Sequence, residues 1–166
     1  MHGVLYNYFA EDHNRIDSYF QNAIVDIQNI DMESYDKFRN GLLRHISIEE
    51  KIALPAIARL QGGKPSDDAA RIRLEHGAIG ALLVPLPTPV VIANIQNILE
   101  KHNELEEQRG GIYDRLEQLA GDETQELLNQ IKNAPYVTPN KYNEKPEVIE
   151  AVKRAVERAG YTFIDK

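Results

Sequence analysis

Apolar residues recur at steps of three and four positions along four segments of the first 120 residues. This spacing places them on one face of a helix that packs against a core. The four predicted helices span about 9–30, 32–60, 68–83 and 88–121. Because the loops between them are short, consecutive helices are expected to be antiparallel neighbours. The pattern predicts an all-α fold, an antiparallel up-down-up-down four-helix bundle.

Prolines and capping residues refine the predicted helix ends. Pro55 lies inside the second helix and is expected to kink it or loosen its last turns. Thr88 and Pro89 form a natural N-cap and first turn for the fourth helix. That helix is predicted to continue without a break through Tyr113, interpreted as a core residue, to a stop near Gly121.

The helical spacing of apolar residues becomes weaker beyond the fourth predicted helix. We expect residues 1–121 to form the bundle and residues 122–166 to form a C-terminal helical extension, with short helices at 124–133 and 146–160. The last of these is amphipathic, so it has an apolar face to cover. The extension is expected to pack on the bundle or on a partner, and the sequence leaves a homodimer open.

Composition narrows the classes of function. A chain of 166 residues fits one well-buried domain and is too short for two. The net charge of −7 argues against a nucleic-acid partner. The absence of cysteine excludes thiol catalysis, disulfides and thiolate-held metal clusters. With no predicted signal peptide or membrane span, a cytoplasmic protein with no membrane partner is the default expectation.

Several polar residues lie on the apolar stripes of the predicted helices. One histidine falls on each helix: His13, His45, His76 and His102. Two of them begin the same motif, in which Glu49 or Glu106 follows four positions later. A step of four points both side chains the same way, about 6 Å apart along the helix axis. A pair of this kind can hold two neighbouring metal ions, with the carboxylate spanning them.

Simpler explanations exist for each residue taken alone. Taken alone, His13 could be a solvated histidine in a first helical turn, and His45 could form a buried ion pair with Glu49. His76 could be a hydrogen-bonded histidine in the core. The protein as a whole would then be a metal-free helical interaction module. Because these explanations require four unrelated coincidences, one on each helix, a shared site is favoured.

Three nearby acidic residues are expected on solvated faces. Asp17 follows His13 by four positions, but its short side chain suits a solvated or capping role. Glu50 and Glu107 directly follow the two glutamates of the motifs. Each is turned about 100° from its neighbour, so neither is expected to be a ligand.

The order of these motifs resembles the hemerythrin-like, or HHE cation-binding, domains. Their mark is a lone histidine on the first helix, HxxxEE…LP on the second, EH on the third and a second HxxxEE on the fourth. Here the motifs read DHNRI at 12–16, HISIEEKIALP at 45–55, LEHGAI at 74–79 and HNELEE at 102–107. The resemblance covers about residues 9–120 and implies an antiparallel bundle around a non-haem di-iron centre bridged by carboxylates.

The resemblance also implies the ligands and the cofactor. Carried over residue by residue, the metal ligands are His13, His45, Glu49, His76, His102 and Glu106. The implied cofactor is a pair of iron ions, Fe2+ or Fe3+, with a bridging oxo or hydroxo group. A mixture of imidazole and carboxylate also suits manganese and tolerates zinc.

One departure from the resemblance bears on function. Oxygen-carrying hemerythrins have a second histidine one turn after the third-helix histidine, where this chain has Gly80. The expected function is therefore binding of a small ligand, such as oxygen, peroxide or nitric oxide, for sensing, storage or delivery. A di-iron redox enzyme and an iron-donating cluster-repair protein are the alternatives. The sequence does not decide whether the protein is an enzyme.

Overall fold

The computed structural model describes residues 1–165, and its regular secondary structure within that range is entirely helical. The α-helices are α1 (Val4–Ala23), α2 (Met32–Ile48), α3 (Leu54–Leu60), α4 (Ala69–Leu82), α5 (Pro89–Glu107), α6 (Ile112–Ala120), α7 (Thr124–Lys132) and α8 (Pro146–Arg158). A π-helical turn, η1 (Glu49–Ala53), joins α2 to α3, and a 3-10 turn, η2 (Gly121–Glu123), joins α6 to α7. The predicted all-α class is confirmed.

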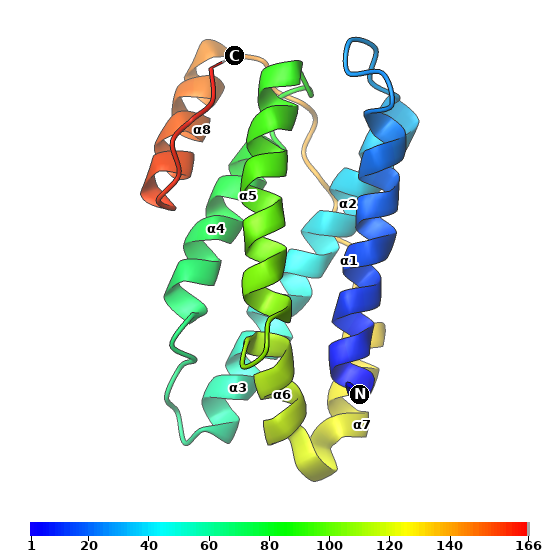
Figure 1. Cartoon of the computed structure of the whole chain (residues 1–166), viewed down its shortest axis with the longest axis vertical. Helices are drawn as coiled ribbons and strands as arrows, with labels where there is room; N and C mark the ends of the chain where they lie inside the picture. Colours follow the sequence, from blue (N-terminus) through cyan, green and yellow to red (C-terminus); the bar gives the residue numbers. More distant parts are fainter. Residues whose placement is uncertain (166) are drawn as a thin grey trace.

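The long helices α1, α2, α4 and α5 run along the longest axis of the molecule (Figure 1). Helix α1 packs closely against α2, and α4 packs against α5. The short helices α3, α6 and α7 gather at one end, whereas α8 lies along α4 near the other end (Figure 1). Both helices of the C-terminal extension therefore lie against the bundle.

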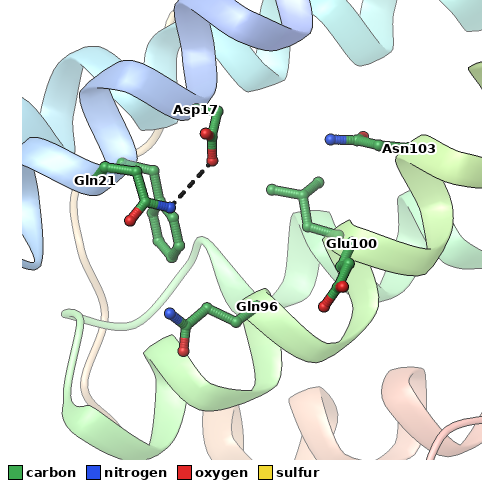
Figure 2. Close-up of a pocket in the computed structure, with 7 residues that line it drawn as sticks. Asp17, Gln21, Gln96, Glu100 and Asn103 are labelled. Carbon is green, nitrogen blue, oxygen red and sulfur yellow. Dashed lines mark hydrogen bonds between the residues drawn. The ribbon is translucent and has the colours of Figure 1, made fainter.

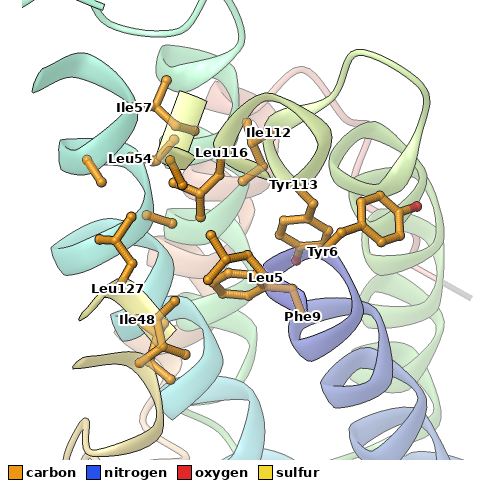
Figure 3. Packing of buried hydrophobic residues seen from close by; sticks show 14 of the residues in the cluster. Leu5, Tyr6, Phe9, Ile48, Leu54, Ile57, Ile112, Tyr113, Leu116 and Leu127 are labelled. Atoms are coloured by element: carbon orange, nitrogen blue, oxygen red, sulfur yellow. The ribbon is translucent and has the colours of Figure 1, made fainter. Parts of the chain in front are cut away.

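The apolar core is divided into two clusters. The first lies at the end formed by α3, α6 and α7 and includes Leu5, Phe9 and Leu127 (Figure 3). The second includes Ile16 and Val156, the latter from α8. On α1, Phe9 of the first cluster and Ile16 of the second stand on either side of His13. A layer of buried polar residues thus separates the two apolar clusters.

The predicted helix boundaries near the prolines agree with local chemistry. The Thr88 hydroxyl accepts a hydrogen bond from the Val91 amide at 3.2 Å, and Pro89 is the first residue of α5. The loosening expected near Pro55 is present as the π-helical turn η1, which directly precedes α3. Proline lacks the N–H that an α-helical ladder needs. Isolated π-helical turns are frequent at functional sites, and η1 begins at Glu49.

The prediction of one continuous fourth helix was wrong. Helix α5 ends at Glu107, Gln108 is extended, and Gly110 has a φ of 81°, a value that favours glycine. A Cβ on Gly111 would lie 2.7 and 2.8 Å from backbone carbonyl oxygens at the end of α5. The double glycine therefore allows a tight break that other residues would obstruct. The break sets the position of Tyr113 on α6.

Candidate metal centre

The polar layer brings together all six residues that the resemblance implied as ligands. Their exposed fractions are at most 5 %. Their ligand atoms form two groups, within each of which every atom lies within 4.8 Å of the others. The first group is His13, His45, Glu49 and Glu106, and the second is Glu49, His76, His102 and Glu106. Each group can hold a metal ion, and the two groups share both carboxylates.

Glu106 faces both groups with different oxygen atoms. Its Oε1 lies 3.3 Å from Nε2 of His13. Its Oε2 lies 3.1 Å from Nε2 of His102 and 3.6 Å from Nε2 of His76. A carboxylate that presents one oxygen to each of two sites is arranged as a bridge between two cations.

Glu49 also contacts both groups, although less symmetrically. Its Oε1 lies 3.4 Å from Nε2 of His45 and 3.3 Å from Nε2 of His76. Its Oε2 accepts a hydrogen bond of 2.8 Å from the Tyr113 hydroxyl. The π-helical turn that begins at Glu49 therefore places this carboxylate between the two sites.

Within residues 1–165, four buried atoms on residues of the second group have no hydrogen-bond partner. One is His76 Nδ1, and the other three face the centre of the group: Glu49 Oε1, His76 Nε2 and Glu106 Oε2. His76 Nε2 lies 3.3 Å from Glu49 Oε1 and 3.6 Å from Glu106 Oε2, but neither contact is a hydrogen bond. An unsatisfied buried polar group costs about 1–3 kcal/mol. A single cation among the three atoms would satisfy all of them, so the donor set fits a metal ion.

A carboxylate faces the second ring nitrogen, Nδ1, of every histidine in the layer. The pairs are Asp12 with His45 at 2.8 Å, Glu75 with His102 at 2.8 Å, Glu107 with His13 at 3.0 Å and Glu50 with His76 at 3.6 Å. In each pair the carboxylate and the histidine come from different elements. A carboxylate on α1 faces the histidine of α2, and one on η1 faces the histidine of α4. A carboxylate on α4 faces the histidine of α5, and one on α5 faces the histidine of α1. The four supporting carboxylates thus form a closed ring around the helices. Three of them are hydrogen-bonded to Nδ1, whereas Glu50, at 3.6 Å, faces His76 without a hydrogen bond.

This ring has a direct chemical consequence. A carboxylate that accepts the Nδ1 hydrogen fixes the tautomer and leaves Nε2 free as a metal ligand. It also orients the imidazole plane, and in this layer the Nε2 atoms of all four histidines face the shared glutamates. Histidines that bind metals in proteins usually have such a partner.

This role of the acidic residues was not predicted from the sequence. Glu50 and Glu107 were expected on solvated faces, yet their side chains are only 38 % and 34 % exposed and face histidine rings. Asp12 and Glu75, each directly before a proposed ligand histidine, stand in the quoted motifs DHNRI and LEHGAI but were given no role of their own. The available signal was the acidic residue adjacent in sequence to four of the six proposed ligands.

The layer has a strongly negative electrostatic character. Burial opposes protonation of His45, but the Glu49 and Asp12 carboxylates raise its pKa to about 10. Burial likewise opposes protonation of His102, whose pKa Glu106 and Glu75 raise to about 9. Carboxylates that stabilise positive charge on buried imidazoles also attract a metal cation, which would replace those protons.

Tyr113 places its hydroxyl oxygen in the first group. This oxygen lies 3.0 Å from Nε2 of His13, 3.0 Å from Nε2 of His45, 2.8 Å from Glu49 Oε2 and 3.0 Å from Glu106 Oε1. The residue is fully buried, as expected for a core position. Its hydroxyl, however, belongs to the candidate metal centre.

Aromatic packing and the break before α6 fix the Tyr113 ring. The ring stacks on Phe9 at a centroid distance of 4.7 Å and meets the edge of Tyr6 at 6.0 Å. Burial, followed by the Glu106 and Glu49 carboxylates, raises the pKa of Tyr113 well above its ordinary value. Without a cation nearby, Tyr113 is therefore a neutral hydrogen-bond donor.

A polar hollow of about 280 Å³ opens between α1 and α5 (Figure 2). Its lining residues are Asp17, Phe20, Gln21, Gln96, Leu99, Glu100 and Asn103. Asp17 is exposed and accepts a hydrogen bond from Gln21 at 3.2 Å, so it keeps the solvated role expected from the sequence. None of the six proposed ligands lines the hollow, but Leu99 and Asn103 lie within one helical turn of His102.

Comparisons with known proteins add no further evidence about this centre. No family model matches the chain, and no curated protein or solved structure matches it either. Within residues 1–165, no helix combines the length and apolar character needed to cross a membrane. The chemistry of the site therefore rests on its own donor atoms.

Proposed function

We propose that this protein is a hemerythrin-like, non-haem di-iron protein built on an up-down-up-down four-helix bundle. It binds a small ligand such as oxygen, peroxide or nitric oxide, for sensing, storage or delivery. The observation that carries the proposal is the pair of buried His and Glu groups that share Glu49 and Glu106.

Charge balance supports two ions in one buried layer. Two divalent ions bring four positive charges, of which the Glu49 and Glu106 carboxylates cancel two and a bridging hydroxide would cancel one more. The ring of Asp12, Glu50, Glu75 and Glu107 supplies further negative charge just outside the ligands. This balance makes it feasible to bury the ions away from water.

The donor types support iron. Imidazole and carboxylate ligands without thiolate suit iron or manganese and tolerate zinc. When bound, a pair of iron ions supplies redox chemistry and coordination positions for a diatomic or peroxide ligand. The chain itself supplies the orientation of the ligands, because Asp12, Glu75 and Glu107 each lie within hydrogen-bond distance of one histidine Nδ1.

The first prediction concerns stoichiometry. Because the two groups share both carboxylates, we expect protein produced in iron-replete cells to contain close to two irons per chain, separated by about 3.5–4 Å as in other two-metal sites. Elemental analysis together with protein quantification checks the number. A reproducible value below one iron per chain would contradict a dinuclear centre.

The second prediction concerns the bridging carboxylate. Glu106→Gln removes the negative charge shared by both groups, so the variant is expected to lose at least one iron per chain while its helical content is retained. The control is Glu104→Gln, an exposed residue on the same helix that is expected to keep full occupancy. Full occupancy in the Glu106→Gln variant would show that Glu106 is only an ion-pair partner of the histidines.

A further inference from the structure

The Tyr113 oxygen has more close neighbours than a buried hydroxyl requires. Its contacts, at 2.8–3.0 Å, are two histidine Nε2 atoms and two carboxylate oxygens. A phenol has only one hydrogen to donate, and either carboxylate alone would satisfy it. Tyr35 is equally buried in the second apolar cluster, and its hydroxyl has no hydrogen-bond partner among the described residues. The surroundings of Tyr113 therefore call for an explanation beyond core packing.

The distances match those between neighbouring ligands of one metal ion. For an octahedral ion with bonds of about 2.1 Å, adjacent ligand atoms lie about 3.0 Å apart. The Tyr113 oxygen stands at this spacing from a ligand atom of every residue in the first group, His13, His45, Glu49 and Glu106. It thus occupies the place of a fifth ligand, above the four that the group already provides.

We propose that Tyr113 is itself a ligand of the iron held by His13 and His45. This inference depends on the proposed function and makes the two irons unequal. Among residues 1–165, the first iron would then have five protein ligands and the second only the four of its group. The iron at His76 and His102 keeps more open positions, so it is the one that takes the small ligand.

Coordination converts the Tyr113 phenol into a phenolate. The O–H bond of Tyr113 breaks, its proton leaves to solvent, and the oxygen electron pair is donated to the iron. In the metal-free protein, the phenol oxygen lies against two carboxylate oxygens, of Glu49 at 2.8 Å and of Glu106 at 3.0 Å. A cation among the same atoms reverses the local potential, as bound ions do for other ligands. The added negative charge favours the ferric state of this iron.

The test is spectroscopic and uses the whole chain loaded with iron and oxidised in air. Iron(III) bound by a phenolate gives a charge-transfer band in the visible range, and excitation in that band enhances phenolate vibrations in the Raman spectrum. We expect both signals in the native protein. Tyr113→Phe is expected to retain two irons but lose both signals. The matched control, Tyr35→Phe, removes a hydroxyl from an equally buried ring in the other cluster and is expected to keep them.

The outcomes separate this inference from the proposed function. Two irons per chain without the phenolate signals, or signals that persist in Tyr113→Phe, would overturn the role of Tyr113 and leave the di-iron proposal intact. Failure of the native protein to bind iron would overturn both. If Tyr113→Phe does not fold, Tyr6→Phe replaces it. Tyr6 is the tyrosine whose ring packs on Tyr113, so signals unchanged in Tyr6→Phe and Tyr35→Phe support Tyr113, and signals lost in either overturn it.

Discussion

Removal of the metal is expected to lower the melting temperature of the protein by about 10 °C or more. Chelation leaves at least three buried atoms of the second group unsatisfied, on Glu49, His76 and Glu106. Each unsatisfied atom lowers the free energy of unfolding by about 1–3 kcal/mol, so together they lower it by several kcal/mol. For a chain of this size, each kcal/mol shifts the melting temperature by about 2–4 °C. Loss of a ligand that binds only the native state acts in the same direction.

Thermal melts before and after chelation, with metal loss confirmed by elemental analysis, measure this effect. Addition of Fe(II) under anaerobic conditions should restore the original melting temperature. The control is the double variant His45→Leu with His102→Leu, which is expected to bind no iron and to melt at the same temperature with or without chelator. Identical melting curves for the native protein with and without its metal would contradict the metal-centre interpretation.

Much of the bundle could be predicted because each long helix buries a single face. The stripe of α1 through His13, Ile16 and Phe20 has the same spacing in the sequence and in the structure, where all three residues are buried. The break after α5 could not be found this way, because Tyr113 and Leu116 continue the apolar spacing across it. The double glycine was the only local signal, and periodicity does not detect it.

The proposed ligands could be predicted from the sequence, whereas the carboxylates that face them could not, and the reason is physical. Helical spacing gives the direction in which a side chain leaves its own helix, and that was enough to align His45 with Glu49. It does not give the side chain's reach to a neighbouring helix. Glu107 contacts His13 on α1 because of how α1 and α5 pack. The position of the Tyr113 oxygen depends both on the break between α5 and α6 and on the packing of the ring. Neither residue spacing nor composition could therefore predict it.

The supporting ring leads to the last prediction, which concerns affinity. Asp12→Asn keeps the size of the side chain but removes the charge of the carboxylate whose Oδ2 lies 2.8 Å from His45 Nδ1. An amide can also donate to Nδ1, which favours the tautomer whose Nε2 is protonated and cannot bind metal. Loss of such a partner typically lowers metal affinity 10–100-fold. We expect the affinity for Fe(II) to fall by about this factor, as measured by competition with a chelator of known affinity.

Asp17→Asn provides the matched control for this variant. Asp17 lies on the same helix, carries the same charge and follows His13 by four positions, but it is exposed and bonds only to Gln21 among the described residues. General loss of negative charge would weaken Fe(II) binding in both variants to a similar, small extent. A specific role for the ring requires a large loss in Asp12→Asn alone. Equal affinities in the two variants would show that the carboxylates around the histidines act only as diffuse charge, without setting tautomer or orientation.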